Sequence, residues 1–288
     1  MTNDSSKNAV IFYFSGTGNT WWVSTELSEQ LNKYGFKSSA YSIETVSPEI
    51  TAGLIDDSFL VGFGYPIHGS DLPQSMKDFI LKLPQSQGKK TFTFCTQWLW
   101  SGDGAAIGAS MLTEKGFDVQ WGEHFLMPNN VSVSIIRLPY TNDPGRLSAI
   151  RKRAGRRISR FVNYLVGDRS SRRGFNSFAH LLGSLQRVPY RRYYPNLQDD
   201  IAVNKEVCID CGDCVRLCPV GNLYYAGDTI DTKGNCILCT RCYNFCPVAA
   251  ITYMKRPHLP ERGEPYRGPV ESFNPSVLIT PAETNRQA

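Results

Sequence analysis

Eight of the nine cysteines in this chain of 288 residues lie in two short runs with the same spacing, Cys-x-x-Cys-x-x-Cys-x-x-x-Cys-Pro. The first run contains Cys208, Cys211, Cys214, Cys218 and Pro219, and the second contains Cys236, Cys239, Cys242, Cys246 and Pro247. This is the bacterial spacing for two [4Fe–4S] clusters, in which the fourth cysteine of each run ligates the cluster of the other run. The spacing therefore predicts cluster I on Cys208, Cys211, Cys214 and Cys246, and cluster II on Cys236, Cys239, Cys242 and Cys218.

A pair of tetrahedral zinc sites is the main alternative, because Cys-x-x-Cys pairs also bind zinc. Zinc ribbons need neither a third cysteine in each run nor the final Cys-Pro, so the spacing favours iron–sulfur clusters. The ninth cysteine, Cys95, ends an apolar run and is expected in a buried strand.

Thiolate clusters require a reducing compartment. The first residues show no basic stretch followed by an apolar stretch, so no signal peptide is predicted. No apolar run approaches the length of roughly 18 residues from which a membrane span would be suspected. We therefore expect a cytoplasmic protein without a membrane span.

A turn rich in glycine and hydroxyl groups follows the apolar run 9–14 and precedes a helix expected at 21–34. It consists of Ser15, Gly16, Thr17, Gly18, Asn19 and Thr20. Such a turn can bind a phosphate through backbone amides and the helix N-terminus. A Walker loop would need a lysine, and a dinucleotide fingerprint would need a small residue in place of Trp21. The turn instead fits a flavodoxin-type site for the phosphate of FMN, with an ordinary glycine-rich turn as the alternative.

Strands and helices continue to alternate, with strands expected at 58–63, 91–95 and 117–127 and helices at 74–83 and 104–115. This alternation predicts an α/β fold with a doubly wound parallel sheet, whose ligands bind beyond the carboxyl ends of the strands. Two further loops should therefore reach the cofactor through Tyr65, Pro66, Ile67, His68, Gly69, Thr96, Gln97, Trp98, Trp100 and Gly102. Tyr65 and either Trp98 or Trp100 are expected to cover the flavin ring. Ordinary packing is the alternative for these aromatics, as a surface position is for His68, and no catalytic residue is predicted.

The chain resembles the flavodoxin–ferredoxin fusion proteins of the EFR1 type in segments 14–20, 64–69 and 125–130 and in the two cysteine runs. The resemblance implies one non-covalent FMN on a flavodoxin-like domain, and two [4Fe–4S] clusters on a small α+β ferredoxin-like domain. The expected division is 1–166 for the flavodoxin-like domain, 167–199 for a basic connector, 200–256 for the ferredoxin domain and 257–288 for a proline-rich tail. The sequence departs from the family pattern at Trp21, Trp22, Trp98 and Trp100, close to the expected flavin.

Positive charge is concentrated in residues 146–195, which contain 13 Lys and Arg but one acidic residue, whereas the whole chain has a net charge of +5. Asp143 and Pro144 predict the start of a helix that extends to about Leu165. A loop at 167–174 and a helix at 176–186 should follow. No nucleic-acid motif accompanies the charge, so we expect no nucleic acid. The segment should instead offset the charge of the cofactors or dock an acidic redox partner.

Together these features predict an electron-transfer flavo-iron–sulfur protein whose clusters and FMN link a low-potential donor to a redox partner protein. The partner would be a ferredoxin, or a ferredoxin- or flavin-dependent reductase. The alternative is an FMN-dependent oxidoreductase that reduces a quinone or enone and receives electrons from the clusters. A purely structural, arginine-rich interaction module would leave the FMN loop without a use. The tail should run extended along the protein or meet a partner.

Overall fold

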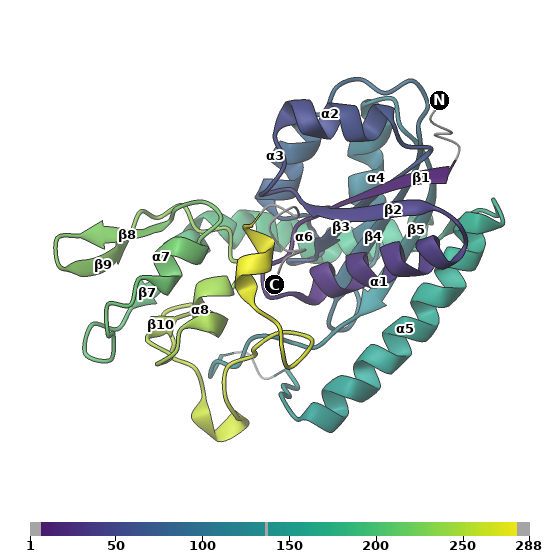
Figure 1. Ribbon diagram of the computed structural model, residues 1–288. Helices are drawn as coiled ribbons and strands as arrows, with labels where there is room; N and C mark the ends of the chain where they lie inside the picture. The colour runs from purple at the N-terminus through teal and green to yellow at the C-terminus, as the bar shows by residue number, and fades with distance from the viewer. Residues whose placement is uncertain (1–6, 136–137, 281–288) are drawn as a thin grey trace.

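The computed structural model describes residues 7–135 and 138–280. The N-terminal residues 1–6 and residues 281–288 of the predicted tail therefore lie outside the described residues. Figure 1 shows a large α/β part built mainly from the first half of the chain, beside a smaller part that contains both cysteine runs. Within the described ranges, no helix is both long enough and apolar enough to cross a lipid bilayer.

The large part is built on a six-stranded parallel sheet in the order β2-β1-β3-β4-β5-β6. The strands are β1 (Asn8–Tyr13), β2 (Lys37–Ser42), β3 (Leu60–Pro66), β4 (Lys90–Gln97), β5 (Asp118–Leu126) and β6 (Ser171–Arg172). The order of the first five strands is that of the flavodoxin-like doubly wound fold. The fold predicted from the sequence is thus confirmed. Cys95 is fully buried in β4, as expected.

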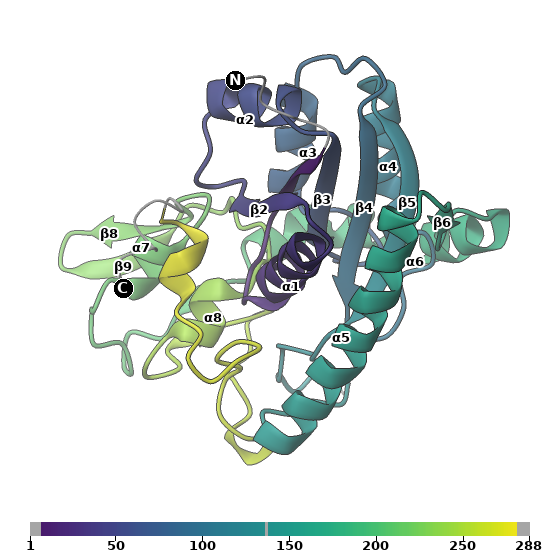
Figure 2. The same cartoon turned by 45° about the vertical axis from the view of Figure 1, so that its right-hand side comes forward.

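Helices cover both faces of this sheet (Figure 2). One face packs against α1 (Asn19–Lys33) and α5 (Pro144–Val166), with Ile11 and Phe94 among its buried residues. The other face, which includes Val10 and Phe12, packs against α3 (Gln74–Lys82) and α4 (Gly104–Glu114). The remaining helix of this part, α2 (Pro48–Asp56), and strand β2 were not predicted from the sequence. Alternate side chains of β1 thus pack into the hydrophobic cores on opposite faces of the sheet, as expected for a strand covered on both faces.

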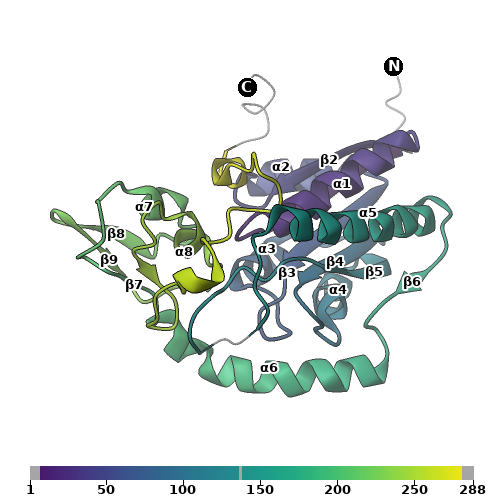
Figure 3. The same ribbon diagram turned by 90° about the horizontal axis from the view of Figure 1, so that it is seen from below.

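The chain between the two parts differs from the prediction in two respects. The segment expected as a loop at 167–174 contains β6, which extends the sheet beside β5. The following helix, α6 (Ser177–Gln198), begins after the N-cap Asn176 but continues well beyond the predicted end at 186. Pro189 and Pro195 lie inside it, although a proline in a helix interior removes a hydrogen bond and usually ends or kinks the helix. Figure 3 shows α6 running along the outside of the molecule, from β6 towards the smaller part.

The smaller part has α+β character, as predicted. It contains the helices α7 (Asp213–Leu217) and α8 (Arg241–Phe245), the antiparallel pair β8 (Leu223–Ala226) and β9 (Thr229–Thr232), and the pair β7 (Ala202–Val203) and β10 (Ile251–Thr252). The sequence repeat is also a backbone repeat. Asp210 and Gly212 have left-handed conformations, and so do Leu238 and Thr240 at the equivalent positions of the second run.

The proline-rich tail returns to the flavodoxin-like part and forms two 3₁₀ turns, η2 (Pro260–Arg262) and η3 (Pro275–Leu278). The Tyr266 hydroxyl donates to Asn19 Oδ1 (2.6 Å) at the start of α1, and Phe273 packs against Trp21. The described part of the tail therefore lies along the protein, one of the two arrangements expected for it.

Candidate functional site

The turn between β1 and α1 has the features of an anion-binding loop. Gly18 adopts a left-handed conformation (φ 94°), and its N–H donates to Ser15 Oγ (3.1 Å). The first hydrogen bond of α1 runs from Trp22 N–H to the Gly18 carbonyl (2.9 Å). The N–H groups of Asn19 and Thr20 therefore have no helical partner and remain available to an anion. We call residues 15–20 the phosphate loop.

A cavity of about 170 Å³ lies against the phosphate loop, at the carboxyl ends of the strands. Eleven of the sixteen residues predicted to contact a cofactor line it: Ser15, Gly16, Thr17, Asn19, Thr20, Pro66, Ile67, His68, Thr96, Gln97 and Trp98. The structure thus brings together parts of all three predicted loops. Trp98 is the one predicted ring-covering aromatic that reaches this cavity.

The other five predicted residues lie away from the cavity. Tyr65 is fully buried under α4, where its hydroxyl bonds to the Gly104 carbonyl (3.0 Å) and accepts from Gly108 N–H (3.2 Å), so its predicted place over a flavin ring is wrong. Trp100 lies outside the cavity with 45% of its surface exposed. The three glycines lie against other segments: Gly18 against the tail, and Gly69 and Gly102 against α6. The sequence indicated which residues belong to each loop, but it did not indicate whether their side chains point into the cavity.

Five further residues line the cavity and were not predicted as flavin contacts: Met127, Pro128, Asn129, Asn130 and Cys239. Asn129 and Asn130 follow β5, as the other contact loops follow their strands, so their position was a usable signal. Cys239 was predicted only as a cluster ligand. Its position in the cavity wall depends on how the two parts of the chain pack together. A local sequence pattern does not predict such packing.

The polar groups of the cavity suit a phosphate and a flavin without any cation. Asn130 Nδ2 donates to Thr17 Oγ1 (2.9 Å), which leaves the Thr17 hydroxyl hydrogen free to donate to an anion. Thr20 and Thr96 share a hydrogen bond between their hydroxyls (2.8 Å). His68 Nδ1 is shielded from solvent and has no hydrogen-bond partner among the residues that the structure describes. Burial lowers the pKa of His68 to about 4, against the opposing charge of Asp71, so its ring is neutral near pH 7. FMN fits this donor set.

Helix α6 fastens the two loops that approach the cavity after β3 and β4. Arg187 forms a bidentate pair with Asp103 (2.9 and 3.1 Å), and Arg191 forms one with Asp71 (2.7 and 3.0 Å). Both carboxylates are buried. Burial alone raises the pKa of Asp71, but hydrogen bonds and charge from Arg191 and Lys77 bring it below its usual value. Part of the basic segment therefore holds the protein together internally.

We expect Arg187→Met to lower the free energy of unfolding by about 3–5 kcal/mol, because it removes the bidentate partner of the buried Asp103. Thermal and denaturant unfolding under anaerobic conditions would measure the change. Arg192→Met is the control, since Arg192 is exposed on the same helix and should change stability by no more than about 0.5 kcal/mol. Similar effects of the two substitutions would contradict this role for Arg187.

Cysteines of both runs lie close to one another in the smaller part of the protein. Burial raises the pKa of Cys214 to about 11, and so do the nearby thiols of Cys246, Cys208 and Cys211. Burial raises the pKa of Cys236 to about 12, with further contributions from the thiols of Cys239 and Cys218. Cys242 likewise lies near Cys239, Cys236 and Cys218, and it also lies near Cys214 of the first run. The assignment of four cysteines to each cluster therefore stays a prediction. We call Cys208, Cys211, Cys214 and Cys246 the first thiol set, and Cys236, Cys239, Cys242 and Cys218 the second thiol set.

Backbone amides donate to the sulfurs at equivalent places in both runs. Asp210 N–H and Leu238 N–H donate to the first cysteine of each run (3.4 and 3.3 Å). Asn222 N–H and Ala250 N–H donate to the fourth (3.1 and 3.2 Å). Such bonds stabilise thiolates and tune cluster potentials. In residues 7–135 and 138–280, no three Cys, His, Asp or Glu side chains are arranged to bind one metal ion. The donor chemistry, four thiols in each set, fits iron–sulfur clusters.

The two candidate sites meet at Arg241, whose side chain is completely buried. Its guanidinium donates to the carbonyls of Ser15 (2.8 Å), Gly16 (3.2 Å) and Leu217 (2.9 Å), and to both carboxylate oxygens of Glu44 (2.9 and 2.6 Å). All five N–H donors of the arginine are therefore used. Arg241 was not identified from the sequence. It lies between Cys239 and Cys242, and no sequence pattern near it indicates a contact with the phosphate loop.

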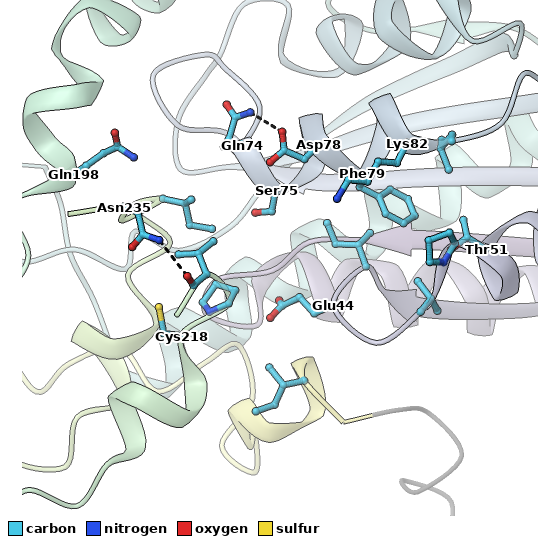
Figure 4. Close-up of a pocket in the computed structure, with 18 of the residues that line it drawn as sticks. Glu44, Thr51, Gln74, Ser75, Asp78, Phe79, Lys82, Gln198, Cys218 and Asn235 are labelled. Carbon is cyan, nitrogen blue, oxygen red and sulfur yellow. Dashed lines mark hydrogen bonds between the residues drawn. The ribbon is translucent and has the colours of Figure 1, made fainter. Parts of the chain in front are cut away.

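A larger cavity of about 870 Å³ opens at the same junction. Figure 4 shows Gln74, Asp78 and Lys82 of α3 along one side, with Glu44 and Cys218 approaching from the others. Gln74 Nε2 donates to Asp78 Oδ1 (2.7 Å) within this wall. Cys218 and the two residues after it line both this cavity and a small neighbouring cavity, which Cys236, Cys239 and Cys242 also line. One member of the second thiol set, Cys218, therefore lies in the wall of this cavity.

Known proteins resemble separate parts of this chain. A family model for the 4Fe–4S binding domain matches residues 201–224, which include the first cysteine run. A flavodoxin from the domain Archaea is 17% identical and covers 54% of this chain and 99% of its own, with a TM-score of 0.36. Flavodoxin 2 from Bacillus cereus is also 17% identical and covers 56% of this chain and 99% of its own, with a TM-score of 0.41. No curated protein matches the chain.

Longer proteins also contain a similar part. The rubredoxin oxygen:oxidoreductase of Desulfovibrio gigas is 19% identical over 54% of this chain, with a TM-score of 0.36. The matched region spans 37% of that protein, and 35% of a flavo di-iron protein from Thermotoga maritima. The observed strand order and the matched domain define the class: an iron–sulfur protein with a flavodoxin-like part.

Proposed function

We propose that this chain is an electron-transfer flavo-iron–sulfur protein of the EFR1 fusion type, with one FMN and two [4Fe–4S] clusters. FMN would supply exchange of one or two electrons, whereas each cluster exchanges one electron at a time. The observation that carries the proposal is the position of Cys239, a member of the second thiol set, in the wall of the cavity at the phosphate loop. The proposed site of cluster II and the proposed FMN cavity would therefore share a wall.

The phosphate loop and the neighbouring groups from 66–68, 96–98 and 127–130 would hold FMN. Cluster I would be held by Cys208, Cys211, Cys214 and Cys246, and cluster II by Cys236, Cys239, Cys242 and Cys218. Cys211 is exposed, whereas Cys236, Cys239 and Cys242 are buried. The exposed Cys211 supports exchange of electrons with a partner at cluster I, and the burial of three cysteines of the second set supports an internal connection to FMN. Thiolate chemistry of this kind supports a cytoplasmic location.

The partner would be an acidic redox protein, a ferredoxin or a ferredoxin- or flavin-dependent reductase. Five basic residues are exposed along α5, namely Arg146, Lys152, Arg153, Arg156 and Arg160. This arrangement supports docking by electrostatic attraction, which salt weakens. A rate of reduction by ferredoxin that does not change with ionic strength would contradict docking through α5.

Anaerobic reconstitution followed by spectroelectrochemistry tests the proposal. We expect one FMN and about eight iron atoms per chain, with flavin and cluster signals that titrate reversibly. Cys95→Ser is the control, because Cys95 lies in β4 outside both thiol sets and its loss should leave the iron content unchanged. A reconstituted protein that binds no flavin would refute the proposed function.

A further inference from the structure

The second cysteine run holds the phosphate loop from outside the cavity. Arg241 donates to the Ser15 and Gly16 carbonyls, so it fixes two consecutive peptide groups of the loop. The Cys239 carbonyl packs directly on Gly16, and a Cβ at that position would overlap the carbonyl oxygen. The loop and the run therefore cannot move independently.

A second connection reaches the side of the loop that faces the cavity. Asn130 Nδ2 donates both to Thr17 Oγ1 (2.9 Å) and to Thr240 Oγ1 (3.0 Å). The Thr240 hydroxyl in turn donates to the Cys239 carbonyl (2.8 Å). These bonds join a hydroxyl in the cavity wall to the segment between Cys239 and Cys242.

Thr240 occupies a backbone position that favours glycine. Its φ is 57°, and the equivalent residue of the first run is Gly212, with φ 73°. A β-branched residue in the left-handed region is strained, and such strain persists only where the surroundings hold the residue in place. Of these two equivalent residues, only the threonine can supply a hydroxyl, and that hydroxyl accepts from Asn130. The strained position is therefore linked to the contact with the loop.

We propose that assembly of cluster II and binding of FMN are coupled. Ligation of Cys239 and Cys242 would fix Thr240 and Arg241 between them, and these positioning residues hold the phosphate loop ready for the anion. This inference rests on the proposed function. Among the described residues, neither the cavity lining nor the hydrogen bonds of the phosphate loop include a member of the first thiol set. Cluster I should therefore lack this coupling.

Coupling between two binding sites is reciprocal, and its usual size is about 5- to 150-fold in affinity. The matched variants are Cys242→Ser and Cys214→Ser, which remove the buried third cysteine of the second and first run. Anaerobic titration with FMN, followed by quenching of flavin fluorescence, gives the dissociation constant. We expect Cys242→Ser to weaken FMN binding at least about tenfold, and Cys214→Ser to change it less than about threefold. Equal losses, or no loss in either variant, would overturn the coupling.

Two further measurements keep the test independent of folding defects. Thr240→Gly removes the hydroxyl while relaxing the strained backbone, so it should weaken FMN binding about fivefold or more without lowering the unfolding temperature. In the unmodified protein, bound FMN should slow the loss of cluster II to an iron chelator and leave the loss of cluster I unchanged. An unchanged affinity in Thr240→Gly, or equal protection of both clusters, would contradict the coupling while leaving the proposed function intact. Failure of the unmodified protein to bind FMN would overturn both.

Discussion

Replacement of Arg241 by methionine should lower the free energy of unfolding by about 3–5 kcal/mol, because one partner of a buried ion pair would disappear. The pair with Glu44 has N–O distances of 2.6 and 2.9 Å, and the arginine side chain has no exposed surface. The substitution also leaves the carbonyls of Ser15, Gly16 and Leu217 without their donor. Denaturant unfolding, followed by circular dichroism under anaerobic conditions, would measure the loss.

Arg216 provides the control for this prediction. It pairs with Asp213 at 3.0 Å, one turn away on α7, and both side chains are exposed. Exposed pairs contribute at most about 1 kcal/mol, so Arg216→Met should be mild. If Arg241→Met were equally mild, the buried contact between the two parts would not contribute to stability as inferred.

Loss of Cys218 should remove cluster II, although Cys218 belongs to the first run, and loss of Cys246 should remove cluster I. Each single variant is expected to retain about four iron atoms per chain, because the other thiol set is complete. Iron analysis and electron paramagnetic resonance of the reduced proteins would measure the remaining cluster.

Double variants identify which cluster is lost. Cys218→Ser combined with Cys242→Ser should still retain about four iron atoms, because both changes affect the same set. Cys218→Ser combined with Cys214→Ser should retain none, because the changes affect different sets. The opposite pattern would mean that each run ligates its own cluster.

The elements that were predicted correctly carry their signals in neighbouring residues. The start of α5 follows from Asp143, which caps the helix by accepting from Arg146 N–H (2.8 Å), and from Pro144 in the first turn. The sequence signal of the phosphate loop is also local, because its glycines and hydroxyl-bearing residues lie between a buried strand and a helix. By contrast, β2 has the polar sequence KSSAYS and lies at the sheet edge, so it lacks the apolar run of a central strand.

The remaining errors arise from contacts between distant segments. Local rules end α6 before Pro189, but Arg187 and Arg191 anchor this helix to Asp103 and Asp71, which lie far earlier in the chain. The exchange of the fourth cysteines between the two thiol sets stays a prediction that rests on the bacterial spacing. The contact between Arg241 and the phosphate loop joins two segments that are far apart in the chain, and no sequence pattern in either segment predicts it.

Helix α6 also limits how far the two halves of this protein can be treated as modules. The middle of α6 holds the loops of the flavodoxin-like part through Arg187 and Arg191, whereas Gln198 at its C-terminal end donates to the Cys236 carbonyl (3.2 Å). A fragment cut before α6 would lose the arginine partners of two buried carboxylates, and one cut after it would lose a support of the second thiol set. Exchange of either half with a relative should therefore succeed only when α6 and its acidic partners are transferred together.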